Sequence, residues 1–106
     1  MTTMKSSDHV ITLQKLSDAP SARFAVIVFS SDGSETKHDV TVSERTYHQL
    51  TNGDATLETL LEQSFNFLLE REPKESILAN FDLSVISNYF SDYETTIKER
   101  LQKSNR

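Results

Sequence analysis

The chain has 106 residues, a net charge of −5 and no cysteine. This length suits one domain with a single hydrophobic core, and the negative charge opposes non-specific binding to nucleic acid or to anionic lipid. The lack of cysteine excludes disulfides and thiolate chemistry, and it fits a reducing, cytoplasmic compartment.

Residues 1–7 are small and polar, which is typical of a disordered N-terminal tail. They contain no apolar stretch of the kind that a signal peptide needs. The longest apolar run, Phe24 to Phe29, has six residues, whereas a helix that spans a bilayer needs about 20. We therefore expect a cytoplasmic protein without a membrane anchor, with one α+β domain over residues 8–103 and a frayed end at 104–106.

Three segments predict β-strands. Residues 10–16 alternate partly between apolar and polar, and residues 36–42 alternate cleanly. Residues 23–30 (RFAVIVFS) are apolar on both faces, which is typical of a central strand. A turn around Gly33 joins the second and third strands into a hairpin. The sequence thus predicts an antiparallel three-stranded sheet with 23–30 in the middle.

The segment after the strands predicts helices. Ser43 is suited to cap a short helix over 44–51. Leucine and phenylalanine at spacings of three and four predict a main helix over 55–72, which Pro73 ends. This helix is expected to cover one face of the sheet. The later helices, or a second protomer, are expected to cover the apolar strip that the central strand places on the other face.

The last third of the chain predicts further helices, after a short connecting turn or helix over 74–80. Asp82 can cap a helix over 83–90, and the S-x-x-E capping box at Ser91 predicts another over 92–103. Apolar residues keep helical register across Ser91, so one bent helix and two separate helices both fit the pattern. The predicted fold class is α+β, with a β-β-β sheet followed by three to four helices packed on it.

An aromatic and aliphatic stripe near the C-terminus is the leading candidate for a binding surface. It consists of Tyr89, Phe90, Tyr93, Ile97 and Leu101. Such side chains often anchor protein interfaces, and at helical spacing they also form ordinary core. With no catalytic signature elsewhere, the stripe favours a non-catalytic protein-interaction or regulatory module, whose partner is another protein or a second copy of the chain.

A small enzyme is the second hypothesis, based on His38 or His48 paired with a carboxylate as a general base. The sequence contains no H-E-x-x-H pair, no glycine-rich phosphate loop and no G-x-S-x-G elbow. A zinc site normally needs three or four ligands, and the histidines are far apart. We therefore predict no cofactor and no metal, and we assign no catalytic residue.

Nucleic-acid binding through the basic C-terminal helix is the third hypothesis. Lys98, Arg100 and Lys103 are its candidate residues. Cations at a helix C-terminus also offset the helix dipole, and no aromatic residues are interleaved with these three. The composition therefore favours a structural interpretation of these cations.

Residues 65–94 (FNFLLEREPKESILANFDLSVISNYFSDYE) resemble the C-terminal half of a family of short uncharacterised bacterial proteins. The shared pattern is F-x-FLLEREPKESIL-x-x-FDLSVI-x-x-YF-x-x-YE. The family more often has proline where this chain has Ser91, and that proline would favour two helices. The resemblance implies a bacterial origin and a helical layout, and it implies no activity.

Overall fold

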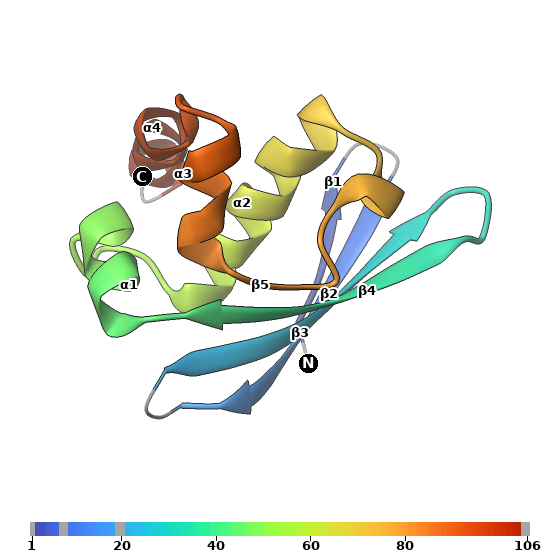
Figure 1. Cartoon of the computed structure of the whole chain (residues 1–106), viewed down its shortest axis with the longest axis horizontal. Helices are drawn as coiled ribbons and strands as arrows, with labels where there is room; N and C mark the ends of the chain where they lie inside the picture. Colours follow the sequence, from blue (N-terminus) through green and yellow to red (C-terminus); the bar gives the residue numbers. More distant parts are fainter. Residues whose placement is uncertain (1, 7–8, 19–20, 105–106) are drawn as a thin grey trace.

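A computed structural model describes residues 2–6, 9–18 and 21–104, and it describes side chains for 9–18 and 21–102. A layer of helices lies on one β-sheet (Figure 1). The elements are β1 (Thr2–Ser6), β2 (His9–Ser17), β3 (Ala22–Ser30), β4 (Glu35–Val42), α1 (Glu44–Thr51), α2 (Leu57–Arg71), the 3₁₀ turn η1 (Lys74–Ser76), β5 (Asn80–Asp82), the 3₁₀ turn η2 (Leu83–Val85), α3 (Ile86–Tyr89) and α4 (Tyr93–Ser104). The α+β class predicted from the sequence is confirmed.

The sheet is mixed, with strand order β1-β2-β3-β4-β5. Strands β2, β3 and β4 pair antiparallel with β3 between them, whereas β5 pairs parallel with β4. The expectation of an antiparallel sheet of three strands is therefore wrong in its detail, because the structure adds a strand at each edge. A parallel neighbour needs a long crossover, and α1 and α2 provide it between β4 and β5.

Thr2–Ser6 form β1, which pairs antiparallel with β2. The sequence predicted a disordered tail here, because the segment has no apolar period. Backbone hydrogen bonds to the free edge of β2 need no such period. Residues 1 and 7 of the predicted tail, and residues 105 and 106 of the predicted frayed end, lie outside the described residues.

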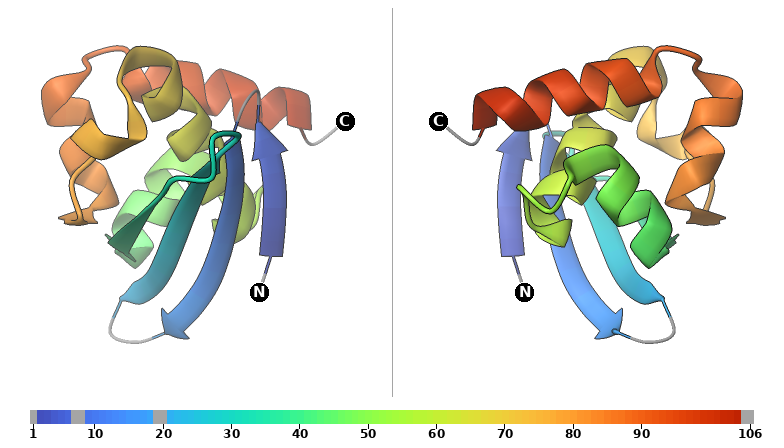
Figure 2. Two further views of the ribbon diagram at one scale, coloured as in Figure 1. Left: turned by 90° about the vertical axis from the view of Figure 1, so that its right-hand side faces the viewer. Right: turned by 90° about the vertical axis from the view of Figure 1, so that its left-hand side faces the viewer.

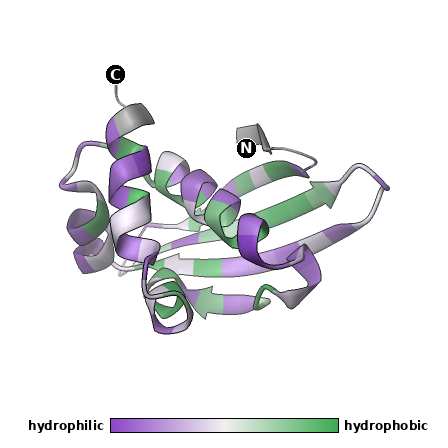
Figure 3. Cartoon of the chain, turned by 90° about the horizontal axis from the view of Figure 1, so that it is seen from above, coloured by the Kyte–Doolittle hydropathy of each residue, from purple (hydrophilic) through white to green (hydrophobic). Residues whose placement is uncertain are grey.

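The hydrophobic core lies between the helices and one face of the sheet. Phe24, Val26 and Val28 of β3 are buried on this face, whereas Ile27 and Phe29 lie on the opposite face and are only partly buried. The described helices gather on a single side of the sheet (Figure 2), and hydrophobic stretches run along the strands beneath them (Figure 3). The late helices therefore do not cover the second face, and the alternative that a second protomer covers it stays a prediction.

Residues 83–104 form two separate helical parts, which decides between the two arrangements that the sequence left open. The turn η2 and the single turn of α3 end at Tyr89, and Phe90 has an extended backbone with φ −131° and ψ 104°. The chain then begins α4 at Tyr93. The predicted cap Asp82 accepts a hydrogen bond from the backbone N–H of Ser84 at 3.0 Å.

A buried hydroxyl pair joins α2 to α4. The Oγ of Ser64 donates to the carbonyl of Leu60 at 2.7 Å, and it lies 2.7 Å from the Tyr93 hydroxyl. Since the hydroxyl proton of Ser64 is already donated to Leu60, the Tyr93 hydroxyl is the donor in the second bond. Both side chains are buried, and this burial raises the pKa of the Tyr93 phenol.

Replacing Ser64 with alanine is expected to destabilise the fold by about 2 kcal/mol, because the buried Tyr93 hydroxyl then has no acceptor. Tyr93→Phe removes the donor itself, so its expected effect is about 1 kcal/mol. Urea denaturation of both variants and of the double variant is the measurement. The double variant should cost clearly less than the sum, and strictly additive losses would contradict the pairing.

Candidate functional site

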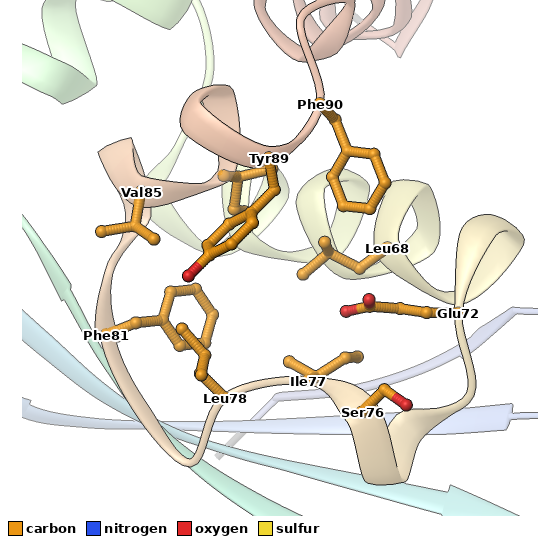
Figure 4. A pocket seen from close by; sticks show the side chains of 10 residues that line it. Leu68, Glu72, Ser76, Ile77, Leu78, Phe81, Val85, Tyr89 and Phe90 are labelled. Carbon is orange, nitrogen blue, oxygen red and sulfur yellow. The ribbon is translucent and has the colours of Figure 1, made fainter.

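A pocket of about 300 Å³ opens between the C-terminal end of α2, the η1–β5 segment and α3 (Figure 4). We call it the 68–90 pocket, because one continuous stretch of chain forms it. Its lining residues are Leu68, Glu72, Ser76, Ile77, Leu78, Phe81, Val85, Ile86, Tyr89 and Phe90. The volume is at the lower end of the range for small-ligand sites, and the lining is mostly apolar.

Pro73 determines how Glu72 reaches the pocket. A residue before proline is driven out of the helical region, and Glu72 accordingly has an extended backbone just after α2. In Figure 4 its carboxylate points into the space enclosed by the apolar side chains. Burial raises the pKa of the Glu72 carboxyl above its usual value.

His38 of β4 holds the segment between η1 and β5, which forms one wall of the pocket, against the sheet. Its Nδ1 lies 2.7 Å from the carbonyl oxygen of Leu78, and its Nε2 lies 2.8 Å from the Thr36 hydroxyl. Burial lowers the pKa of the His38 imidazole, and the bond to Leu78 opposes this shift only in part. The ring is therefore neutral at pH 7, donating from Nδ1 to Leu78 and accepting at Nε2 from Thr36.

The structure places the two histidines of the enzyme hypothesis in different surroundings. The two described ring partners of His38 are a carbonyl and a hydroxyl, and neither is a carboxylate. His48 lies on the exposed surface of α1, 3.8 Å from Glu44 one turn away. Neither histidine lines the 68–90 pocket.

Lys74 holds η1, which contributes Ser76 to the pocket, on the β3–β4 hairpin. Its buried Nζ donates to the Ser34 hydroxyl and to Glu75, both at 2.7 Å. The Ser34 hydroxyl in turn donates to Asp32 at 2.6 Å. These bonds lower the pKa values of Asp32 and Glu75 and join η1 to the tip of the β3–β4 hairpin.

The predicted stripe is divided between the pocket and the core. Tyr89 is 68% exposed and lines the pocket together with the half-buried Phe90. Tyr93, Ile97 and Leu101 are buried in the core and are at most 3% exposed. The extended Phe90 and the turn at Ser91 and Asp92 redirect the chain between α3 and α4, so the two halves of the stripe do not form one surface.

An aromatic cluster supports the wall of the pocket that Phe90 forms. The ring of Phe67 meets those of Phe90 and Tyr93 edge to face, with centroids 5.7 and 5.3 Å away. The Arg71 guanidinium lies 3.6 Å from the Phe67 centroid and bonds Asp92 at 2.7 Å. These contacts fix the connection between α3 and α4, and with it the position of Phe90.

The two candidate cations of the C-terminal helix whose side chains are described, Lys98 and Arg100, have different surroundings. Lys98 is exposed, whereas Arg100 bonds Glu70 of α2 at 2.7 Å. The side chain of Lys103 lies outside the described residues. The structure thus gives Arg100 a role in holding α4 on α2.

Sequence reasoning missed most of the pocket. Residues 74–80 were interpreted as a connection, so Ile77 and Leu78 were not considered as site residues. The available signal was this apolar pair within a polar segment. Among the described side chains, the large apolar residues that remain well exposed are Leu16, Leu78 and Tyr89, and two of these three flank the pocket.

Two other kinds of site are absent from the described part of the chain. No cluster of three or more histidine, aspartate or glutamate residues there could hold a metal ion. No helix built from these residues has both the length and the apolar character needed to cross a membrane. No protein-family model matches the chain, and no curated protein and no solved structure matches it.

Proposed function

We propose that this chain is a non-catalytic protein-interaction module that holds a side chain of a partner protein in the 68–90 pocket. The observation that carries the proposal is the exposure at its rim, where Leu78 is 45% and Tyr89 68% exposed. Exposed apolar groups around a concave site are typical of docking surfaces, and tyrosine is enriched among interface anchors.

The chemistry of the lining supports binding more than reaction. The pocket offers one carboxylate, from Glu72, and one aliphatic hydroxyl, from Ser76, and it is not lined by histidine or lysine. A general acid and base, or a nucleophile with its base, requires two groups positioned against each other, and no hydrogen bond joins Glu72 to Ser76 in the described part of the chain. An apolar site with a few polar groups suits recognition.

The predicted resemblance to short bacterial proteins also supports the proposal, because the pocket would then have the same role in those proteins. All ten lining residues fall at defined positions of the pattern quoted above. Defined positions include the exposed Leu78 and Tyr89. Packing alone does not require large apolar residues at such exposed positions. We therefore propose that the pattern encodes the pocket as well as the fold.

Replacing Leu78 with serine is expected to weaken partner binding roughly 5- to 150-fold, because truncation of an interface anchor costs roughly 1–3 kcal/mol. Leu16→Ser is a matched control, since both leucines are 45% exposed and Leu16 lies on β2, away from the pocket. Peptides selected from a random displayed library against the wild-type protein provide the ligands. Fluorescence anisotropy with each variant measures their affinity.

Selected peptides should bind Leu16→Ser as they bind the wild type and should lose affinity for Leu78→Ser. If the peptides bind both variants equally, the pocket is not the interaction site. A selection that yields no specific peptide also counts against an interaction module.

A further inference from the structure

Among the described side chains, no positive group is paired with the carboxylate of Glu72. Its sequence neighbour Arg71 bonds Asp92, and Lys74 is directed to Ser34 and Glu75. Within the described residues, no hydrogen bond or ion pair reaches the Glu72 side chain. The pocket therefore contains a single anionic group, half-buried among apolar side chains.

A carboxylate in such surroundings is less stable than in water unless a positive group compensates it. The rest of the lining suits a cation that has an apolar stem. The rings of Phe81, Tyr89 and Phe90 are able to attract a cation through their faces. Leu68 and Ile77 form the aliphatic wall against which methylene groups pack.

We propose that the group held in the 68–90 pocket is a lysine side chain of the partner protein, with its methylene stem on the apolar wall and its ammonium at Glu72. This inference rests on the proposed function. Lysine is a point charge on a flexible four-carbon stem, which matches one carboxylate at the side of an apolar hollow. Arginine also pairs with a carboxylate through its planar fork, and the aliphatic wall favours the longer methylene stem of lysine. The chain's net charge of −5 also favours a basic partner.

Three small probes test the charge and the stem separately. They are Nα-acetyl-lysine methylamide, the same compound acetylated at Nε, and Nα-acetyl-norleucine methylamide. Titrations followed by ¹H–¹⁵N NMR measure each affinity and show where each probe binds. Fragments of this size are expected to bind with dissociation constants in the millimolar range.

The lysine probe is expected to shift the amides of residues 68–90 and to bind about five- to tenfold more tightly than both neutral probes. Glu72→Gln should abolish this preference while leaving norleucine binding unchanged. Glu62→Gln is the matched control, because burial also raises the pKa of Glu62, which lies on the helix just before Glu72 and does not line the pocket.

Equal binding of the lysine and norleucine probes in the pocket would overturn the lysine inference and leave the proposed function standing. Lysine binding that Glu72→Gln does not weaken would overturn it as well. If no probe shifts residues 68–90, the lysine inference also fails. The peptide selection against Leu78→Ser then decides independently whether the pocket binds a partner at all.

Discussion

Replacing Phe67 with alanine is expected to destabilise the fold by about 4 kcal/mol. Phe67 is fully buried and contacts Phe90, Tyr93 and Arg71, which belong to different parts of the chain. Its loss leaves a cavity where α2 meets the α3–α4 connection, and it removes the surface on which the Arg71 guanidinium lies. Urea denaturation at pH 7 measures the free energy of unfolding.

Tyr89→Ala is the matched control, since it also removes an aromatic ring from the same region. Tyr89 is 68% exposed, so its removal is expected to change stability by no more than about 0.5 kcal/mol. A loss below about 1 kcal/mol for Phe67→Ala would show that the cluster does not hold α4 on α2.

His38→Ala is expected to destabilise the fold by about 3 kcal/mol. The ring packs on Phe65 with centroids 5.5 Å apart, and its loss leaves the Leu78 carbonyl and the Thr36 hydroxyl without their partner. Urea denaturation measures the global effect, and hydrogen exchange at residues 77–82 measures the local one. The exposed His48 provides the control, because His48→Ala should have little effect.

The stability contributed by His38 is expected to depend on pH. Its pKa in the folded protein lies below the ordinary value of 6.5, so below pH 6.5 the unfolded chain binds a proton that the folded protein resists. The contribution is therefore complete above pH 6.5 and falls as the pH drops from there toward the folded-state pKa. Accordingly, the destabilisation caused by His38→Ala should be smaller at pH 5 than at pH 7.5. An equal loss at both pH values would show that the ring is protonated in the folded protein as readily as in the unfolded chain.

Strong local patterns predicted most of the fold. The run of β-branched and aromatic residues in 23–30 correctly indicated a central strand, and the predicted helix over 44–51 matches α1. Ser43 caps α1 through the N–H of Thr46, as expected. At these positions, local preference and tertiary packing favour the same structure.

The elements that the sequence did not predict depend on contacts between distant residues. Strand β5 has only three residues, too few for an alternating pattern, and its pairing depends on β4 about forty positions earlier. The pocket has a similar origin, because the lining residue Leu78 is bonded through its carbonyl to His38, 40 positions earlier in the chain. Of the predicted stripe, Tyr89 and Phe90 line the pocket, whereas Tyr93, Ile97 and Leu101 lie in the core. The sequence did not separate these two groups, because the helical spacing of the apolar residues continues across the turn before α4.

The 68–90 pocket is formed by one continuous segment of the chain. This segment is attached to the sheet through the short strand β5 and the hydrogen bond between His38 and the carbonyl of Leu78. Such a segment can detach in a sub-global opening while β2, β3 and β4 remain paired. A side chain bound as proposed would bridge α2 and this segment, so its affinity and the closing equilibrium would be thermodynamically linked. Ligand binding is then expected to slow the hydrogen exchange of the amides between Ile77 and Asp82.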